Sequence, residues 1–97
     1  MESPEHADHQ VRAMPEITVY LTRWCPFCTR AIALLDSKGA EYTAIDVDAD
    51  PTLRQEMMQR SGRRTVPQIF IGETHVGGCD DLFALERQGK LDSLINA

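Results

Sequence analysis

Two cysteines three positions apart are the residues of this chain best suited to chemistry. Cys25 and Cys28 enclose Pro26 and Phe27, and the segment follows a short apolar stretch at residues 17–21. A Cys-x-x-Cys pair beside a strand–helix–strand pattern is typical of thiol–disulfide exchange in intracellular proteins. In that reaction a thiolate attacks a disulfide sulfur and forms a mixed disulfide. The spacing therefore predicts a redox-active pair.

The two sulfurs are expected to differ in role because of where they lie on a helix. Proline is tolerated in the first helical turn, so a helix is predicted from Pro26, with Cys25 at its N-cap. The unpaired N–H groups of that turn and the positive end of the helix dipole favour a thiolate at Cys25. Cys28 lies one turn deeper and is less exposed. We therefore predict that Cys25 attacks and that Cys28 resolves the mixed disulfide.

Two other interpretations of the cysteine pair stay open. Cys-x-x-Cys units hold zinc when a second pair completes the site, but here Cys79 stands alone, with only His75 near it in the sequence. The two thiols could also be inert and buried, although the order strand, cysteine, proline, helix favours a reactive first sulfur. We therefore expect no metal at this site.

The overall composition is that of one small acidic domain. The chain has 97 residues and a formal net charge of −5, which fits one domain and argues against a nucleic-acid partner. No apolar run approaches the roughly 20 residues that span a bilayer, and the first residues lack the features of a secretory signal. The odd count of three cysteines does not fit a secreted disulfide framework. The sequence therefore predicts a cytoplasmic protein without a membrane partner.

The elements that must position the cysteines alternate between strands and helices. Short apolar or β-branched runs predict strands over 17–21, 42–47, 68–71 and 74–76. Helical spacing, caps and glycine stops predict helices over 26–38, 51–61, 80–88 and 91–95. A strand–helix–strand unit implies a parallel strand pair. We predict an α/β fold in which a mixed four-stranded sheet is flanked by helices.

The first residues show no sustained periodicity. Residues 1–15 hold two prolines and two histidines among acidic side chains. They are expected to form a flexible tail, which leaves residues 16–97 as the folded domain.

Three segments, taken in this order, resemble the glutaredoxin family: Cys25-Pro26-Phe27-Cys28, Thr65-Val66-Pro67 and Gly77-Gly78-Cys79-Asp80-Asp81. Thioredoxins share the cysteine pair, whereas the two later segments are much more specific to glutaredoxins. The resemblance covers about residues 17–95. It implies a thioredoxin-like fold and a monomer that reduces protein disulfides and protein–glutathione mixed disulfides. Glutathione would be the reductant and co-substrate, and no metal is expected.

The resemblance also implies a glutathione site along the two later segments. Pro67 would be a cis-proline facing the cysteines, next to the motif residue Thr65. The backbone of Val66 would pair with the cysteinyl part of glutathione, as in strand addition. Backbone N–H groups at Gly78 and Cys79 would hold the γ-glutamyl carboxylate at a helix N-terminus.

Two aspartates and a cysteine complete the γ-glutamyl end of this implied site. The Asp80 carboxylate suits the γ-glutamyl ammonium group. Asp81 either assists it or only stabilises the helix N-terminus. Cys79 would contribute its backbone, and its thiol is expected to be an unreactive bystander.

The sequence departs from the family pattern on either side of the first cysteine. Phe27 replaces the tyrosine most often found in the motif, and it can still pack beside glutathione. A threonine stands where the family often has a lysine, so Arg23, Arg64 or Gln59 would meet the glycyl carboxylate. Arg60, Arg63 and Arg64 also form a basic cluster, which is either a solvated loop or a landing surface for anionic glutathione.

Two other functions stay open. Some glutaredoxins bind an iron–sulfur cluster between two subunits through the first cysteine and glutathione, but the rigid Pro26 disfavours the loop opening that this needs. A thioredoxin-like reductase served by a flavoprotein is the second alternative, and the glutathione-type segments argue against it.

Overall fold

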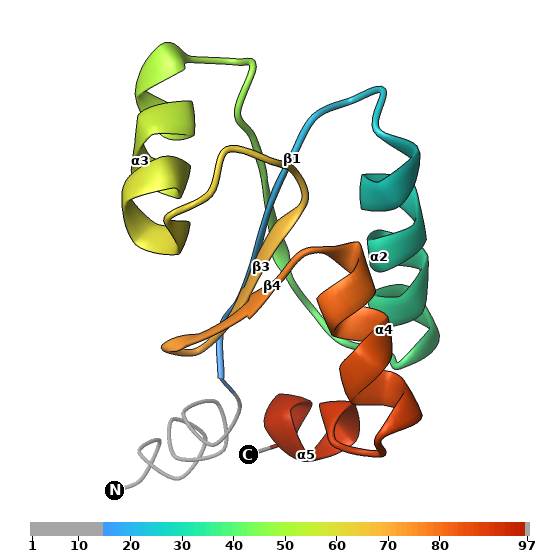
Figure 1. Cartoon of the computed structure of the whole chain (residues 1–97). Helices are drawn as coiled ribbons and strands as arrows, with labels where there is room; N and C mark the ends of the chain where they lie inside the picture. Colours follow the sequence, from blue (N-terminus) through green and yellow to red (C-terminus); the bar gives the residue numbers. More distant parts are fainter. Residues whose placement is uncertain (1–14, 97) are drawn as a thin grey trace, which may run out of the picture.

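The computed structural model describes residues 15–96, which form a four-stranded sheet between helices (Figure 1). In chain order the elements are β1 (Ile17–Leu21), α2 (Pro26–Ser37), β2 (Thr43–Asp46), α3 (Pro51–Ser61), β3 (Gln68–Ile71), β4 (Thr74–Gly77), α4 (Cys79–Arg87) and α5 (Leu91–Ile95). The predicted α/β class is confirmed. The predicted tail over residues 1–15 lies outside the described residues, apart from Pro15.

The sheet is mixed, as predicted, and its strands follow the order β2-β1-β3-β4. β1 pairs in parallel with β2, whereas β1 with β3 and β3 with β4 are antiparallel. Tyr20 near the end of β1 therefore lies opposite Gln68 at the start of β3. Gly77 at the end of β4 lies opposite Ile69. The segments that follow β1, precede β3 and follow β4 consequently meet at one end of the sheet.

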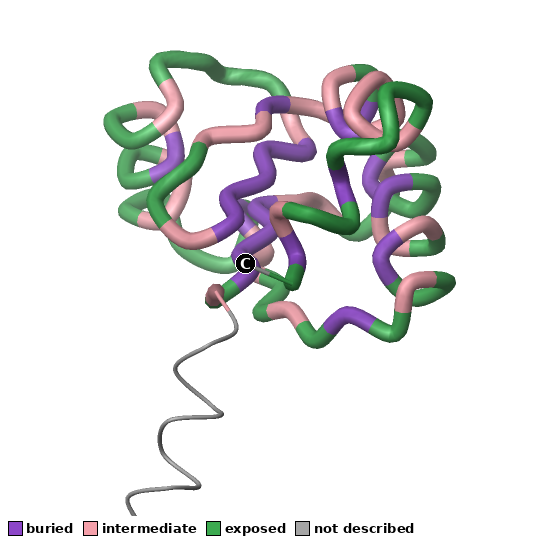
Figure 2. Tube along the Cα trace, turned by 90° about the horizontal axis from the view of Figure 1, so that it is seen from below, coloured by how far each residue is buried: buried purple, intermediate pink, exposed green. Residues whose placement is uncertain are grey.

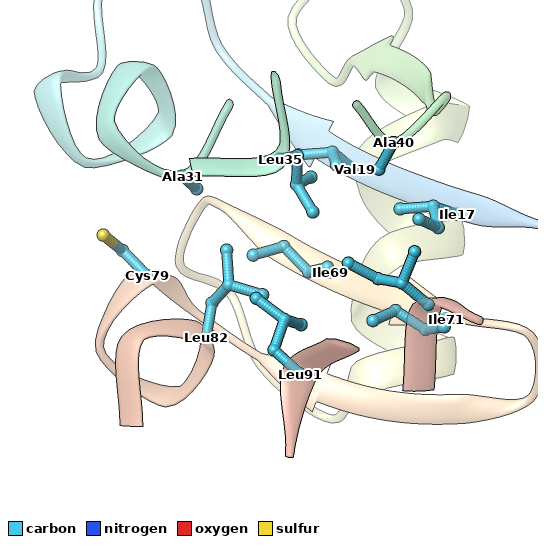
Figure 3. Packing of buried hydrophobic residues seen from close by; sticks show 11 residues of the cluster. Ile17, Val19, Ala31, Leu35, Ala40, Ile69, Ile71, Cys79, Leu82 and Leu91 are labelled. Atoms are coloured by element: carbon cyan, nitrogen blue, oxygen red, sulfur yellow. The ribbon is translucent and has the colours of Figure 1, made fainter. Parts of the chain in front are cut away.

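One face of the sheet carries the larger core. Alternate residues of β1 and β3 point to the same face, and there Val19 and Ile69 pack against Leu35 of α2, Leu82 of α4 and Leu91 at the start of α5 (Figure 3). All five side chains are fully buried. This core attaches α2 and α4 to the same face of the sheet, on the side away from α3 (Figure 1).

The opposite face of the sheet packs against α3. Tyr20 and Phe70, which alternate with the residues of the larger core, form a second buried cluster with Val47 and Met57. Figure 2 shows the buried residues gathered in the central strands and on the inner sides of the helices, with exposed residues on the outer turns. Within residues 15–96 no helix has the length and apolar character needed to cross a membrane.

The observed elements differ from the predicted ones at a few boundaries. The strand predicted over 42–47 pairs only over Thr43–Asp46, although Val47 is buried in the cluster under α3. The helix predicted over 80–88 begins one residue earlier and ends at Arg87. It begins at Cys79 because Gly78 is the N-cap and Asp81 accepts a hydrogen bond from the Gly78 N–H. Sequence spacing alone did not identify this cap.

Candidate active site

Cys25 lies at the point where β1 passes into α2. Its backbone is extended, with φ −104° and ψ 111°, and it forms the N-cap of α2 with Pro26 directly after it. The backbone N–H of Cys28 donates to the Cys25 Sγ over 3.2 Å. The N–H of Thr29 donates to the Cys25 carbonyl over 3.1 Å. The sulfur therefore receives the first-turn donor that the sequence predicted for it, and a thiolate accepts such a bond more strongly than a thiol.

Cys28 occupies a different environment one turn along α2. Only 3% of its surface is exposed. Burial, followed by its hydrogen bond with Cys25, raises the pKa of the Cys28 thiol to about 12. Cys28 is therefore a neutral thiol at physiological pH, so it cannot compete with Cys25 as the first nucleophile.

Native protein treated with iodoacetamide at pH 8 is expected to be alkylated at Cys25 and spared at Cys28. A thiol with a pKa of about 12 is thiolate in only about one molecule in ten thousand at that pH. A raised pKa keeps the proton on, so alkylation of Cys28 should grow only at strongly alkaline pH. Peptide mass mapping of native and urea-unfolded samples measures this selectivity. Equal labelling of both cysteines in the native protein would contradict the burial argument.

The carbonyl of Val66 faces Cys25 from the segment before β3. The distance between the Cys25 Sγ and the Val66 oxygen is 3.8 Å. The peptide bond between Val66 and Pro67 is cis, as the family resemblance implied. Gly78 also lies close to this segment, since a Cβ at Gly78 would stand 3.5 Å from the Pro67 carbonyl oxygen. The three motif segments, far apart in sequence, are thus neighbours in the fold.

A hydrogen-bonded chain holds the segment before Pro67 in place. The side chain of Gln68, which is fully buried, donates to the Thr65 carbonyl oxygen over 3.0 Å and to the Thr65 Oγ1 over 3.2 Å. The Gln68 Oε1 pairs with the His75 Nε2 over 2.8 Å. Because the amide oxygen can only accept, His75 donates through Nε2. The position of Thr65, and through it that of Val66, is fixed from inside the sheet.

A groove of about 220 Å³ opens between these segments. Eight residues that the sequence placed in the site line it: Phe27, Thr65, Val66, Pro67, Gly78, Cys79, Asp80 and Asp81. Arg63 also lines it, although the sequence placed that residue only in a basic cluster. A larger hollow of about 500 Å³ lies at the other end of β1, beside Ile17 and Tyr42. The smaller groove is the candidate active site, because Val66, whose carbonyl oxygen lies 3.8 Å from the Cys25 Sγ, is one of its lining residues.

Arg23, Gln59 and Arg64 are exposed and do not line the groove. Their predicted contact with the glycyl carboxylate stays a prediction that this geometry does not support. The sequence did not predict Arg63 as a lining residue of the groove. Arg63 and Arg64 follow Gly62 in a segment without helical or strand periodicity, so the sequence does not show which of the two faces the groove. The only sequence signal for Arg63 was membership of the basic cluster.

The N-terminus of α4 forms the far wall of the groove. The Asp81 carboxylate accepts from the Gly78 N–H over 2.9 Å and from the Arg63 guanidinium over 3.2 Å. The Gly78 N–H bond, and then Arg63, hold the pKa of Asp81 below its usual value. Asp81 therefore stabilises the N-terminus of α4, which is one of the two roles that the sequence left open, while Asp80 is exposed at the groove.

The side chain of Cys79 lies in the larger core. Its side chain belongs to the larger core cluster (Figure 3), and only 5% of the residue is exposed. Burial raises the pKa of the Cys79 thiol. This environment agrees with the expectation that the residue contributes backbone to the groove and keeps an unreactive thiol.

Comparisons with known proteins show likeness over most of the described residues. A family model described as Glutaredoxin matches residues 17–76. A glutaredoxin of Pseudomonas aeruginosa strain PAO1 is 57% identical over 84 residues, which is 87% of this chain and all of that protein. The solution structure of a Brucella melitensis glutaredoxin is 60% identical and covers 87% of this chain and 91% of that chain, with a TM-score of 0.78. The crystal structure of a buckwheat glutaredoxin–glutathione complex is 34% identical and covers 94% and 84%, with a TM-score of 0.77.

Proposed function

This chain belongs to the glutaredoxin family of thiol–disulfide oxidoreductases with a thioredoxin-like fold, and from that premise we propose that it uses glutathione to reduce protein disulfides and protein–glutathione mixed disulfides. One observation carries the proposal: the Cys25 Sγ stands at a helix N-cap, 3.8 Å from the Val66 carbonyl beside the groove. A disulfide held along that groove would present its sulfur to the nucleophile. The glutathione bound in the buckwheat structure supports this ligand for the groove.

The proposed deglutathionylation needs only Cys25. Its thiolate attacks the glutathionyl sulfur of a mixed disulfide, and the target protein leaves as a thiolate that takes a proton from water. Cys25 then carries glutathione in a new disulfide. The thiolate of a second glutathione attacks the glutathionyl sulfur, which releases oxidised glutathione and returns the Cys25 thiolate.

Reduction of a protein disulfide adds a step at Cys28. After Cys25 forms the mixed disulfide with the protein, Cys28 attacks the Cys25 sulfur and the protein departs as a dithiol. Burial is the main cause of the raised pKa of Cys28, and the neighbouring Cys25 sulfur adds to it. Once Cys25 is bound in a disulfide it carries no negative charge, so Cys28 loses its proton more readily at this stage. Two glutathione molecules then reduce the Cys25–Cys28 bond.

The groove supports a specific placement of glutathione. The Val66 backbone would pair with its cysteinyl residue in the manner of an added strand. The Gly78 N–H already donates to Asp81, so the N–H groups of Cys79 and Asp80 remain for the γ-glutamyl carboxylate at the start of α4. Arg63, which lines the groove, supplies the positive charge for a glutathione carboxylate.

Turnover of a glutathionylated small disulfide tests the proposal. The assay contains reduced glutathione, glutathione reductase and NADPH, and it compares the wild-type protein with Cys28→Ser. Both proteins are expected to turn over this substrate, because Cys25 suffices for it. Cys28→Ser should lose reduction of a protein disulfide. No turnover by the wild-type protein would contradict glutathione dependence.

The remaining partners and conditions are part of the same proposal. We propose a monomer that acts in the cytoplasm, where the thiol pool is kept reduced. Among residues 15–96 no group of three or more His, Cys, Asp or Glu side chains lies together as metal ligands. A cluster shared between two chains and glutathione would show as visible absorbance in protein purified without oxygen. Reduction by thioredoxin reductase without turnover on glutathione would favour the flavoprotein-served alternative.

A further inference from the structure

Two large hydrophobic side chains are exposed within residues 15–96, and both flank the attacking cysteine. Trp24 is 91% exposed and Phe27 is 53% exposed. A single exposed apolar residue is ordinary in a soluble protein. Two of them next to the reactive sulfur, with none elsewhere in the described part of the chain, indicate a surface that receives another molecule.

The proposed glutathione groove accounts for only one of these side chains. Phe27 lines the groove. Trp24 lies outside it, in the turn between β1 and α2, directly before Cys25. Its ring can therefore contact only a bound molecule that extends beyond the groove. Tryptophan is enriched among the residues that dominate the energy of protein–protein interfaces.

Two exposed arginines lie in the two segments that meet at Cys25. Arg23 precedes Trp24, and Arg64 stands two residues before Val66, whose carbonyl is 3.8 Å from the Cys25 Sγ. Both arginines are exposed, and neither forms an ion pair with another residue between 15 and 96. Arg54 and Arg63, by contrast, pair with aspartates. In a chain of net charge −5, these two cations, which have no ionic partner within the described residues, favour an acidic partner near the nucleophile.

We propose that Arg23, Trp24 and Arg64 form a docking surface for the polypeptide part of the substrate. Its occupant is a segment that carries the disulfide or glutathionylated cysteine, with acidic and apolar residues next to that cysteine. Trp24 packs against the apolar residue, and the arginines pair with the acidic ones. The docking surface rests on the proposed function, but it selects among protein substrates and takes no part in bond exchange.

Trp24 itself reports on the docking, because it is the only tryptophan of the chain. Reduced wild-type protein is titrated with two synthetic peptides that carry serine in place of the substrate cysteine. One peptide has glutamates and a leucine around the serine, and the other has lysines and the same leucine. The acidic peptide should shift the Trp24 emission to shorter wavelength and saturate. The shift should weaken as salt screens the charges.

Kinetics with matched substrates separate docking from chemistry. The substrates are the acidic peptide with a glutathionylated cysteine, its lysine counterpart, and glutathionylated 2-mercaptoethanol. Trp24→Ala should raise KM for the acidic peptide about tenfold, which is the typical effect of truncating one interface anchor. Its kcat/KM on the small disulfide should stay within about twofold. Arg23→Gln should reduce the preference for the acidic peptide, whereas Arg87→Gln, which removes an equal charge at the opposite end of α4, should not.

Three results would overturn the docking surface. The first is an emission spectrum that neither peptide changes, or that both change equally. The second is equal turnover of the acidic and basic peptides by the wild-type protein. The third is an equal loss of activity on the peptide and on the small disulfide in Trp24→Ala, since Trp24 would then act on Cys25 or on the fold. If the wild-type protein did not turn over the small disulfide at all, that result would instead contradict the proposed function. The fluorescence titration would still show whether the acidic peptide binds at Trp24.

Discussion

Replacing Cys25 by serine is expected to lower kcat/KM about a thousandfold or more, both for glutathionylated substrates and for protein disulfides, as removal of a covalent nucleophile does. The physical reason is that a serine hydroxyl does not ionise near neutral pH, so no anionic nucleophile stands beside the groove. Every proposed step begins or ends at the Cys25 sulfur. The measurement is steady-state turnover of both substrate types with glutathione, glutathione reductase and NADPH.

The Cys25→Ser variant is expected to fold like the wild-type protein, so a loss of activity would report on the missing thiol. Serine is among the best N-cap residues, so it keeps an acceptor for the Cys28 N–H that now bonds to the Cys25 Sγ. Urea unfolding should therefore give a midpoint close to that of the wild-type protein. A Cys25→Ser variant that is folded and fully active would show that another group is the nucleophile.

Gly77→Ala is expected to destabilise the protein by about 2–4 kcal/mol, as backbone strain and a lost helix cap together do. Gly77 has φ +114°, a conformation that L side chains rarely adopt. A Cβ there would also stand 2.8 Å from the Asp81 Cγ and clash with the carboxylate. The carboxylate would have to leave the Gly78 N–H and Arg63, which loosens the start of α4. Glutathione affinity should fall with stability, because that helix start is one wall of the groove.

Gly89→Ala is the matched control for this substitution. Gly89 follows the same helix with φ +72°, and a Cβ there would meet nothing within 4 Å. It should cost about 1–2 kcal/mol through strain alone. Urea unfolding of both variants, with unchanged m-values, gives the comparison. In an Asp81→Ala background the extra cost of Gly77→Ala should shrink, and an equal cost of the two glycine substitutions would contradict the clash.

Much of the fold followed from local patterns. The order of strands and helices was predicted correctly, because alternating apolar runs, prolines at helix starts and glycines at helix ends act over a few residues. The same local rules placed Cys25 at the N-cap of α2, where Pro26 begins the helix. Several boundaries differ from the predicted ones by one residue, and at the start of α4 the Asp81 carboxylate accepts a hydrogen bond from the Gly78 N–H.

The composition of the groove was predicted less completely. Eight of the predicted residues line it because the resemblance named contiguous motif segments. The choice among arginines was not predictable: Arg63 lines the groove, while Arg23 and Arg64 are exposed outside it. These residues lie in loops, where side-chain direction follows from particular hydrogen bonds rather than from a repeat. One such bond joins the Arg63 guanidinium to the Asp81 carboxylate over 3.2 Å.

The sequence by itself determined the chemistry available to this protein and the elements that carry it. A cysteine at the start of a helix and a second one a turn later depend on neighbouring residues alone. The tertiary structure decided what surrounds that chemistry. Antiparallel pairing of β1 with β3 and of β3 with β4 brings the Val66 carbonyl and the start of α4 to the Cys25 end of the sheet. Tertiary packing also leaves Cys28 buried and Trp24 exposed, because burial depends on contacts between residues far apart in the chain.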